Sequence, residues 1–139
     1  MMIKRVGSAG LAIVVAAGIL VGCSGSGTGV AQAMKPGIPE GVVFEPLSEE
    51  PAATWIERGE TFAIVTWGSG SCPPIATALT ADGPDRVAVT FGSSPNDPCT
   101  ADMSPTTHEF ELPNDVTGSP VIVEVGYEDW PEAHTLTLK

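Results

Sequence analysis

The chain has 139 residues, of which 42% are hydrophobic and 17% are charged. This composition is too apolar for a disordered protein, and the length is too short for two ordinary domains. Six basic residues stand against 17 acidic ones, and the net charge is -11. A nucleic-acid-binding protein needs clustered Lys and Arg to contact phosphate, so we expect no nucleic-acid partner. The acidity also argues against direct docking of the folded part on anionic lipid head groups.

The first 23 residues have the layout of an export signal. Met1–Arg5 is short and charged, and the apolar run Val6–Val21 is shorter than the roughly 20 residues that cross a membrane. The run ends in Leu20-Val21-Gly22-Cys23, which resembles the lipobox of bacterial lipoproteins. In that family the signal peptide is cleaved before the Cys, and the thiol carries a diacylglyceryl group. The resemblance implies a signal peptide over residues 1–22 and a lipid anchor on Cys23, which would hold the protein on the extracytoplasmic face of a cell membrane.

Residues 24–41 are rich in Gly, Ser and Pro and show no hydrophobic periodicity. This composition is typical of a flexible linker, so we expect residues 23–41 to form the lipidated Cys and a tether. Such a tether would have an end-to-end distance of roughly 20–25 Å. The single folded domain is then expected to cover residues 42–139.

Beyond Val42 the sequence alternates apolar and polar residues with a period of two, and Gly, Pro, Asn and Asp separate the runs. This pattern predicts a mainly β fold, a small antiparallel β-sandwich or barrel. Phe62–Trp67 is apolar at nearly every position, which predicts a strand buried on both faces. Ser48–Gly59 fits either one short helix or a strand that starts at Ala53. The other predicted strands lie within 86–91, 109–112, 121–127 and 135–138.

Three cysteines are present, and lipidation of Cys23 would leave Cys72 and Cys99. In an oxidising compartment such a pair usually forms a disulfide. The alternative is a redox or metal pair, but the chain has no Cys-x-x-Cys, and His108 and His134 are not at zinc-finger spacing. The acidic residues near turns do not form the Asp-x-Asp-x-Asp pattern of a calcium loop. We therefore expect a disulfide, no metal site and no cofactor.

Four side chains are candidates for catalysis: Ser69, Ser71, His108 and His134. Two prolines follow the serines and oppose the helix that a nucleophile elbow needs. His108 shares the strand parity of Phe110 and is expected on a core face, and His134 begins the last predicted strand. An enzyme would need one of the histidines to converge on a serine or an aspartate. Because no catalytic motif is present, we expect a protein that is not an enzyme.

The segment Tyr127, Glu128, Asp129 and Trp130 connects two predicted strands with an acidic and aromatic tip. Exposed Trp and Tyr are favoured contact residues at interfaces, so this segment is the expected binding surface unless Trp130 covers the core edge. The leading hypothesis is a non-enzymatic binding domain with an envelope protein or a cell-wall partner. One alternative is an envelope enzyme, or an enzyme-accessory protein, that uses His108 or His134. Another is an inhibitor-like domain that uses the loop from Ser94 to Cys99.

Two stretches of the chain carry a further resemblance. Residues 67–73 read Trp-Gly-Ser-Gly-Ser-Cys-Pro, and residues 99–102 read Cys-Thr-Ala-Asp. Together with flanking residues from Ala53 onward, they are similar to a group of small actinobacterial secreted proteins and lipoproteins. The group shares a Trp-Gly-Ser-x-Ser-Cys-Pro stretch, and Gly70 stands where a Ser is expected. The resemblance implies the disulfide and a β-rich fold; the group has no established activity from which a catalytic residue could be carried over.

Overall fold

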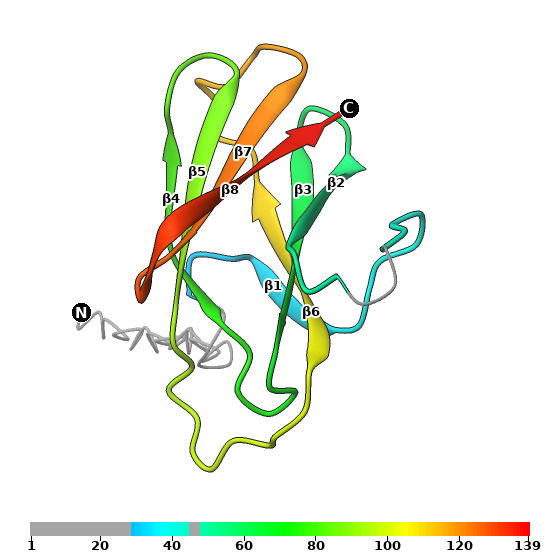
Figure 1. Ribbon diagram of the computed structural model, residues 1–139. Helices are drawn as coiled ribbons and strands as arrows, with labels where there is room; N and C mark the ends of the chain where they lie inside the picture. Colours follow the sequence, from blue (N-terminus) through cyan, green and yellow to red (C-terminus); the bar gives the residue numbers. More distant parts are fainter. Residues whose placement is uncertain (1–28, 45–47) are drawn as a thin grey trace, which may run out of the picture.

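The computed structural model describes residues 29–44 and 48–139 (Figure 1). These residues form eight strands and no helix, and none of their segments is a helix long and apolar enough to cross a membrane. The expected signal peptide and Cys23 lie outside the described residues. The strands are β1 (Ala33–Pro36), β2 (Ala52–Glu57), β3 (Thr61–Gly68), β4 (Ile75–Ala81), β5 (Arg86–Gly92), β6 (Ser104–Glu111), β7 (Val121–Tyr127) and β8 (Trp130–Leu138).

The strands form two four-stranded sheets that pack face to face as a sandwich (Figure 1). The order is β1-β6-β3-β2 in one sheet and β4-β5-β7-β8 in the other. The prediction of a small β-sandwich is thus confirmed, with one departure from an antiparallel arrangement: β5 and β7 are parallel. After β5 the chain crosses to the other sheet, forms β6, and then returns so that β7 begins beside the start of β5. There the Ile122 N–H donates to the Asp85 carbonyl. Because β5 and β7 begin at the same end of the sheet, they run in the same direction.

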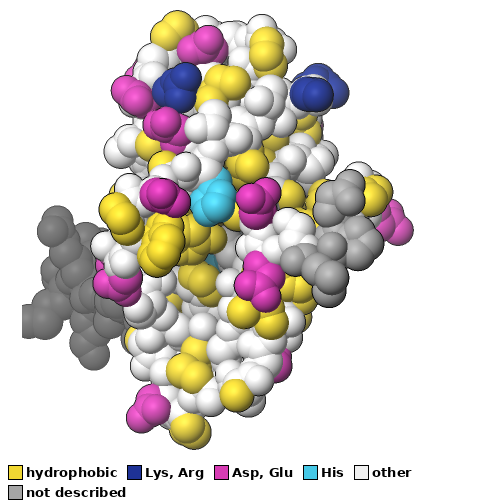
Figure 2. Space-filling model, in the orientation of Figure 1, with side chains coloured by type: hydrophobic (Ala, Val, Ile, Leu, Met, Phe, Trp, Pro, Cys, Tyr) yellow, Lys and Arg dark blue, Asp and Glu magenta, His cyan; other side chains and the backbone are white. Residues whose placement is uncertain are grey.

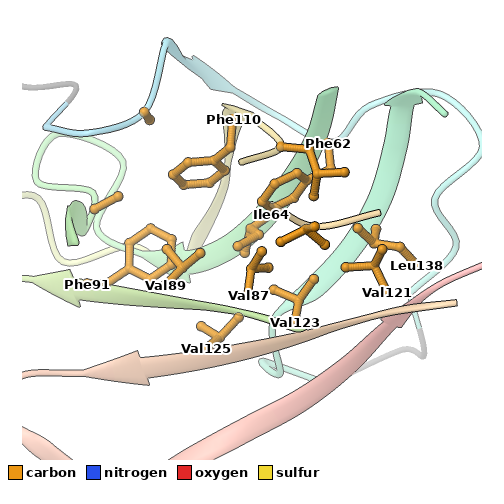
Figure 3. Packing of buried hydrophobic residues seen from close by; sticks show 14 residues of the cluster. Phe62, Ile64, Val87, Val89, Phe91, Phe110, Val121, Val123, Val125 and Leu138 are labelled. Carbon is orange, nitrogen blue, oxygen red and sulfur yellow. The ribbon is translucent and has the colours of Figure 1, made fainter. Parts of the chain in front are cut away.

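The core lies between the sheets, on the faces that strand alternation predicts (Figure 3). Phe62 and Phe110 stack with their ring centroids 5.3 Å apart, and Phe91 from the opposite sheet meets Phe110 edge-on at 6.5 Å. Val123 and Leu138 fill the far end and are almost inaccessible to solvent. Burial of each such side chain stabilises the fold by about 1.5–3 kcal/mol.

Strand β3 is buried on both faces, as its continuous apolar run predicts. Phe62 and Ile64 face the core, whereas Ala63 and Val65 are fully buried without belonging to the core cluster. At the end of β3 the ring of Phe44 packs edge-on against Trp67, with centroids 5.4 Å apart. The segment before β2 therefore covers part of the outer face of this sheet.

The alternative of a short helix in Ser48–Gly59 is wrong, because Ala52–Glu57 is strand β2. It pairs with β3 in an antiparallel register that places Trp55 opposite Phe62. The two rings meet edge-on with centroids 6.5 Å apart. Pairing with β3 satisfies the backbone hydrogen bonds of this segment and packs the half-buried indole of Trp55 against the core.

The expected tether is also wrong over much of its length. Ala33–Pro36 forms β1, which pairs with β6, and Ala31 is only 5% exposed. Upstream of it, the Val30 N–H donates to the Ala76 carbonyl of β4 at 2.9 Å. The folded domain thus includes residues from Gly29 onward rather than from Val42. The sequence did not reveal this strand because β1 is held by main-chain hydrogen bonds to a sheet edge, and such pairing requires no hydrophobic periodicity.

Candidate functional site

A disulfide joins the loop after β3 to the loop between β5 and β6. Cys72 and Cys99 are bonded with their Cα atoms 5.4 Å apart, which confirms the predicted pair. The Asn96 side chain donates to the Ser71 carbonyl at 2.9 Å and so ties the two loops together a second time. The loop from Ser94 to Cys99, considered above as an inhibitor-like element, is therefore attached to its neighbour at both the disulfide and Asn96.

The two sequence stretches that carry the resemblance meet beside this disulfide. The Thr100 backbone N–H donates to Ser71 Oγ at 2.8 Å, and the Gly70 N–H donates to Asp102 Oδ1 at 3.1 Å. The hydroxyls of Thr100 and Ser104 also donate to the Asp102 carboxylate. These hydrogen bonds lower the pKa of Asp102 from 3.8 to about 2, the Ser104 hydroxyl having the largest effect. The residues of both stretches thus hold the loop pair in one conformation.

His108 lies inside the sandwich, as its strand parity predicts. It is fully buried in β6, and its Nε2 is hydrogen-bonded to Thr66 Oγ1 at 2.8 Å. The ring of Phe91 packs edge-on against it, with centroids 4.8 Å apart. Desolvation lowers the pKa of His108 from 6.5 to about 4, so the imidazole is neutral near pH 7.

The structure does not bring the serines and histidines together. The side-chain hydrogen-bond partners of Ser69 are Ser71 and Thr100, within the loop network. His108 is bonded to Thr66, and His134 packs edge-on against Tyr127 with ring centroids 6.4 Å apart. A serine nucleophile requires a base within hydrogen-bond reach, about 2.6–3.2 Å. The hydrogen bonds of the described residues include no serine–histidine pair; serine hydroxyls reach carboxylates only at Asp102 and Asp129.

A hollow of about 540 Å³ lies where the β7–β8 turn faces the segment before β2. Three of its lining side chains are Trp or Tyr, one is His, and two are carboxylates that come from separate parts of the chain. Figure 2 looks onto this face, where histidine, acidic and hydrophobic side chains gather around a depression. The lining residues are Glu49, Pro51, Trp67, Met103, Tyr127, Asp129, Trp130 and His134.

A second hollow, of about 340 Å³, adjoins the first and extends toward the disulfide. Its walls include Phe91, Cys72 and Cys99, and it shares Tyr127 and Asp129 with the larger hollow. We call the two adjoining hollows together the hairpin groove; it consists of the residues that line either hollow, and Tyr127 and Asp129 line both.

The predicted binding segment divides between two environments. Tyr127, Asp129 and Trp130 line the hairpin groove, but Glu128 lines neither hollow. The Glu128 carboxylate instead accepts from the Thr77 hydroxyl of β4 at 2.9 Å. The Asp129 carboxylate accepts from Ser93 Oγ at 3.1 Å, and Ser93 also lines the smaller hollow.

Trp130 is 60% exposed and does not cover the core edge. It begins β8 and pairs with Tyr127 across the two-residue turn. Such exposure is unusual for the largest apolar side chain, and an exposed aromatic group beside a hollow is a common mark of a binding surface.

Sequence reasoning missed many groove residues that lie far from the hairpin in the chain, among them Glu49, Trp67 and Met103 of the larger hollow. Trp67 could have been found from the apolar run of β3, which ends at the groove. Its indole Nε1 is buried without a hydrogen-bond partner among the described residues. Glu49 and Met103 lie in connecting segments, and nothing in their local sequence marks them.

No group of three or more His, Cys, Asp or Glu side chains within 29–44 and 48–139 is arranged to hold a metal ion. Comparison of the chain with protein-family models, with curated proteins and with solved structures found no match. The features that bear on function are therefore the hairpin groove and the sequence of the first 23 residues.

Proposed function

We propose that the protein is a lipid-anchored binding domain of the cell envelope, without enzymatic activity, and that the hairpin groove is its binding site. The observation that carries the site is the 60% exposure of Trp130 at the margin of the larger hollow. A surface that leaves an indole in water beside a hollow lined by aromatic side chains is suited to a partner.

The anchor is supported by the sequence from Met1 to Cys23, in which a charged start and an apolar run end in the lipobox-like residues. Two acyl chains hold a protein stably on a bilayer, so a diacylglyceryl Cys23 would suffice for anchoring. The domain would then face the extracytoplasmic side, where the Cys72–Cys99 disulfide is stable.

The anchor is tested by intact mass of the protein extracted from native membranes. We expect a mass of residues 23–139 plus a diacylglyceryl group, and release of a Cys23→Ser variant from the membrane fraction. An unlipidated mass in the membrane extract would contradict the anchor.

The binding site is tested by placing a photo-crosslinking amino acid at position 130 or at position 115 in membrane-bound protein. Asp115 is exposed on a turn at the opposite end of the sandwich and serves as the control. We expect a discrete adduct, protein or glycan, from position 130 only. Equal labelling from both positions, or none from position 130, would contradict a site in the groove.

A further inference from the structure

Charge is distributed unevenly along the sandwich. Among the described residues the basic side chains are Lys35, Arg58, Arg86 and Lys139. Three of them, Arg58, Arg86 and Lys139, lie at the end of the sandwich opposite the hairpin groove. The fourth, Lys35, forms an ion pair with Glu109 at 2.7 Å at the β1 edge of its sheet. In Figure 2 the Lys and Arg side chains in view lie toward one end of the molecule, away from the hollow. Neither hollow is lined by Lys or Arg.

The groove itself combines aromatic faces with carboxylates. The carboxylates of Asp129 and Glu49 line the larger hollow together with the exposed indole of Trp130, and Asp129 also lines the smaller one. Aromatic faces attract ammonium and guanidinium groups, Trp most strongly, and a nearby carboxylate adds a charge-assisted hydrogen bond. A cation is therefore the ligand group that matches both components of the lining.

The shape of the groove selects the kind of molecule that would carry the cation. The two hollows share Tyr127 and Asp129, so the hairpin groove has Trp130 in one hollow and the disulfide cysteines in the other. A small amine would fill only part of it, whereas an extended peptide could run along both hollows and place a basic side chain at Asp129.

We propose that the hairpin groove binds an extended, basic peptide segment of a partner protein, with a Lys or Arg side chain held between Trp130 and the carboxylates of Asp129 and Glu49. This rests on the proposed function and adds to it the chemistry of the partner. A neutral wall glycan could stack on Trp130, but it would leave the two carboxylates without a matching charge.

The turn supplies a matched pair of variants for the test. Glu128→Gln and Asp129→Asn remove the same charge from adjacent residues, yet only Asp129 lines the groove. Trp130→Ala removes the exposed indole without a change in charge. Thermal melting of each variant checks that the fold is retained, which we expect because all three side chains are exposed.

The probe is a synthetic nine-residue peptide with Lys at alternate positions and Thr between them, and its control is the same peptide with acetyl-lysine. Binding to the full mature chain is measured by fluorescence anisotropy at physiological salt. We expect Asp129→Asn and Trp130→Ala each to weaken binding by about tenfold, Glu128→Gln by less than about threefold, and acetylation to abolish it.

Three results would overturn this inference. Equal losses from Glu128→Gln and Asp129→Asn, with none from Trp130→Ala, would show diffuse attraction by net charge. Equal binding of the acetylated peptide would show that the cation is not recognised. Absence of peptide binding together with a glycan adduct from position 130 would leave the proposed function standing and reject the basic peptide.

Discussion

His108 Nε2 and Thr66 Oγ1 lie 2.8 Å apart inside the sandwich and join β6 to β3 through their side chains. The other imidazole nitrogen, Nδ1, is buried without a hydrogen-bond partner among the described residues. The ring faces Phe91 from the opposite sheet. A titratable group thus lies within the hydrophobic interior, where protonation is costly.

This placement predicts that stability falls in mild acid. The pKa of His108 is lowered to about 4 in the folded protein, against a usual value of 6.5. Between these pH values the imidazole binds a proton more readily in the unfolded chain than in the folded one. The contribution of His108 to the free energy of unfolding is therefore fully present above about pH 6.5 and is lost as the pH falls toward 4. The loss attributable to this group is about 3 kcal/mol. Urea unfolding at pH 7, 5.5 and 4.5 measures it.

A matched substitution isolates the buried group. His134→Gln removes the half-buried histidine of β8 and should leave the pH dependence between 4 and 6.5 in place. His108→Gln should flatten it, at the expense of overall stability. A His108→Gln variant with the same pH dependence as the parent chain would contradict this explanation.

Reduction of the disulfide is expected to destabilise the fold substantially. Cys72 and Cys99 are 27 residues apart, and closure of such a loop contributes about 3.5 kcal/mol through the entropy of the unfolded chain. The Cys72→Ser/Cys99→Ser double variant should show this loss in urea unfolding at pH 7. Thiol labelling of the parent chain should detect neither cysteine until a reductant is added. A loss below about 1 kcal/mol would mean that Asn96 and its neighbours hold the loops without the covalent bond.

Gly29→Ala is expected to detach the N-terminal segment from the sheet edges. Gly29 has a φ of 59°, and an added Cβ would collide with the Ala76 carbonyl oxygen. The Val30 amide, which donates to that carbonyl, should lose protection from hydrogen exchange. Gly41→Ala is the control, because its φ of 83° carries the same backbone strain but nothing lies within 4 Å of the added methyl. Equal protection of Val30 in both variants would contradict the collision.

The Asp102 carboxylate should titrate well below an ordinary aspartate. Its pKa is lowered from 3.8 to about 2, with the Ser104 hydroxyl as the largest cause, then that of Thr100. Folding is therefore favoured by this group above pH 3.8, and the benefit is lost as the pH falls through about 2. NMR titration of the carboxyl carbon measures the value, and Ser104→Ala should raise it. A value near 3.8 in the parent chain would show that the hydroxyls do not donate to Asp102 in solution.

Strand alternation predicted the core well, because side chains that face a buried interior must be apolar at every second residue. It placed Phe110 and His108 on one face, and both are buried. The parallel pairing of β5 and β7 could not be predicted, because it depends on a connection that passes through the other sheet. Strand β1 was missed because its residues pair through the backbone and bury few side chains.

The binding surface was predicted in part. Tyr127, Asp129 and Trp130 line the hairpin groove, but Glu128 turns to Thr77 of β4. Within a two-residue turn the period-two alternation no longer holds, so sequence alone cannot say which carboxylate faces the groove. Residues such as Glu49 reach the groove only through tertiary packing.

The docking of Gly29 on β4 has a consequence for where the domain can act. If Cys23 carries lipid as we propose, only residues 24–28 separate the anchor from Gly29, and five extended residues span at most about 18 Å. Gly29 contacts Ala76 near the start of β4, at the same end of the sandwich as the hairpin groove. The groove would therefore sample a thin layer above the bilayer, and a partner confined to that layer would meet it at a high effective concentration. Modest intrinsic affinity would then be enough for stable association at the membrane surface.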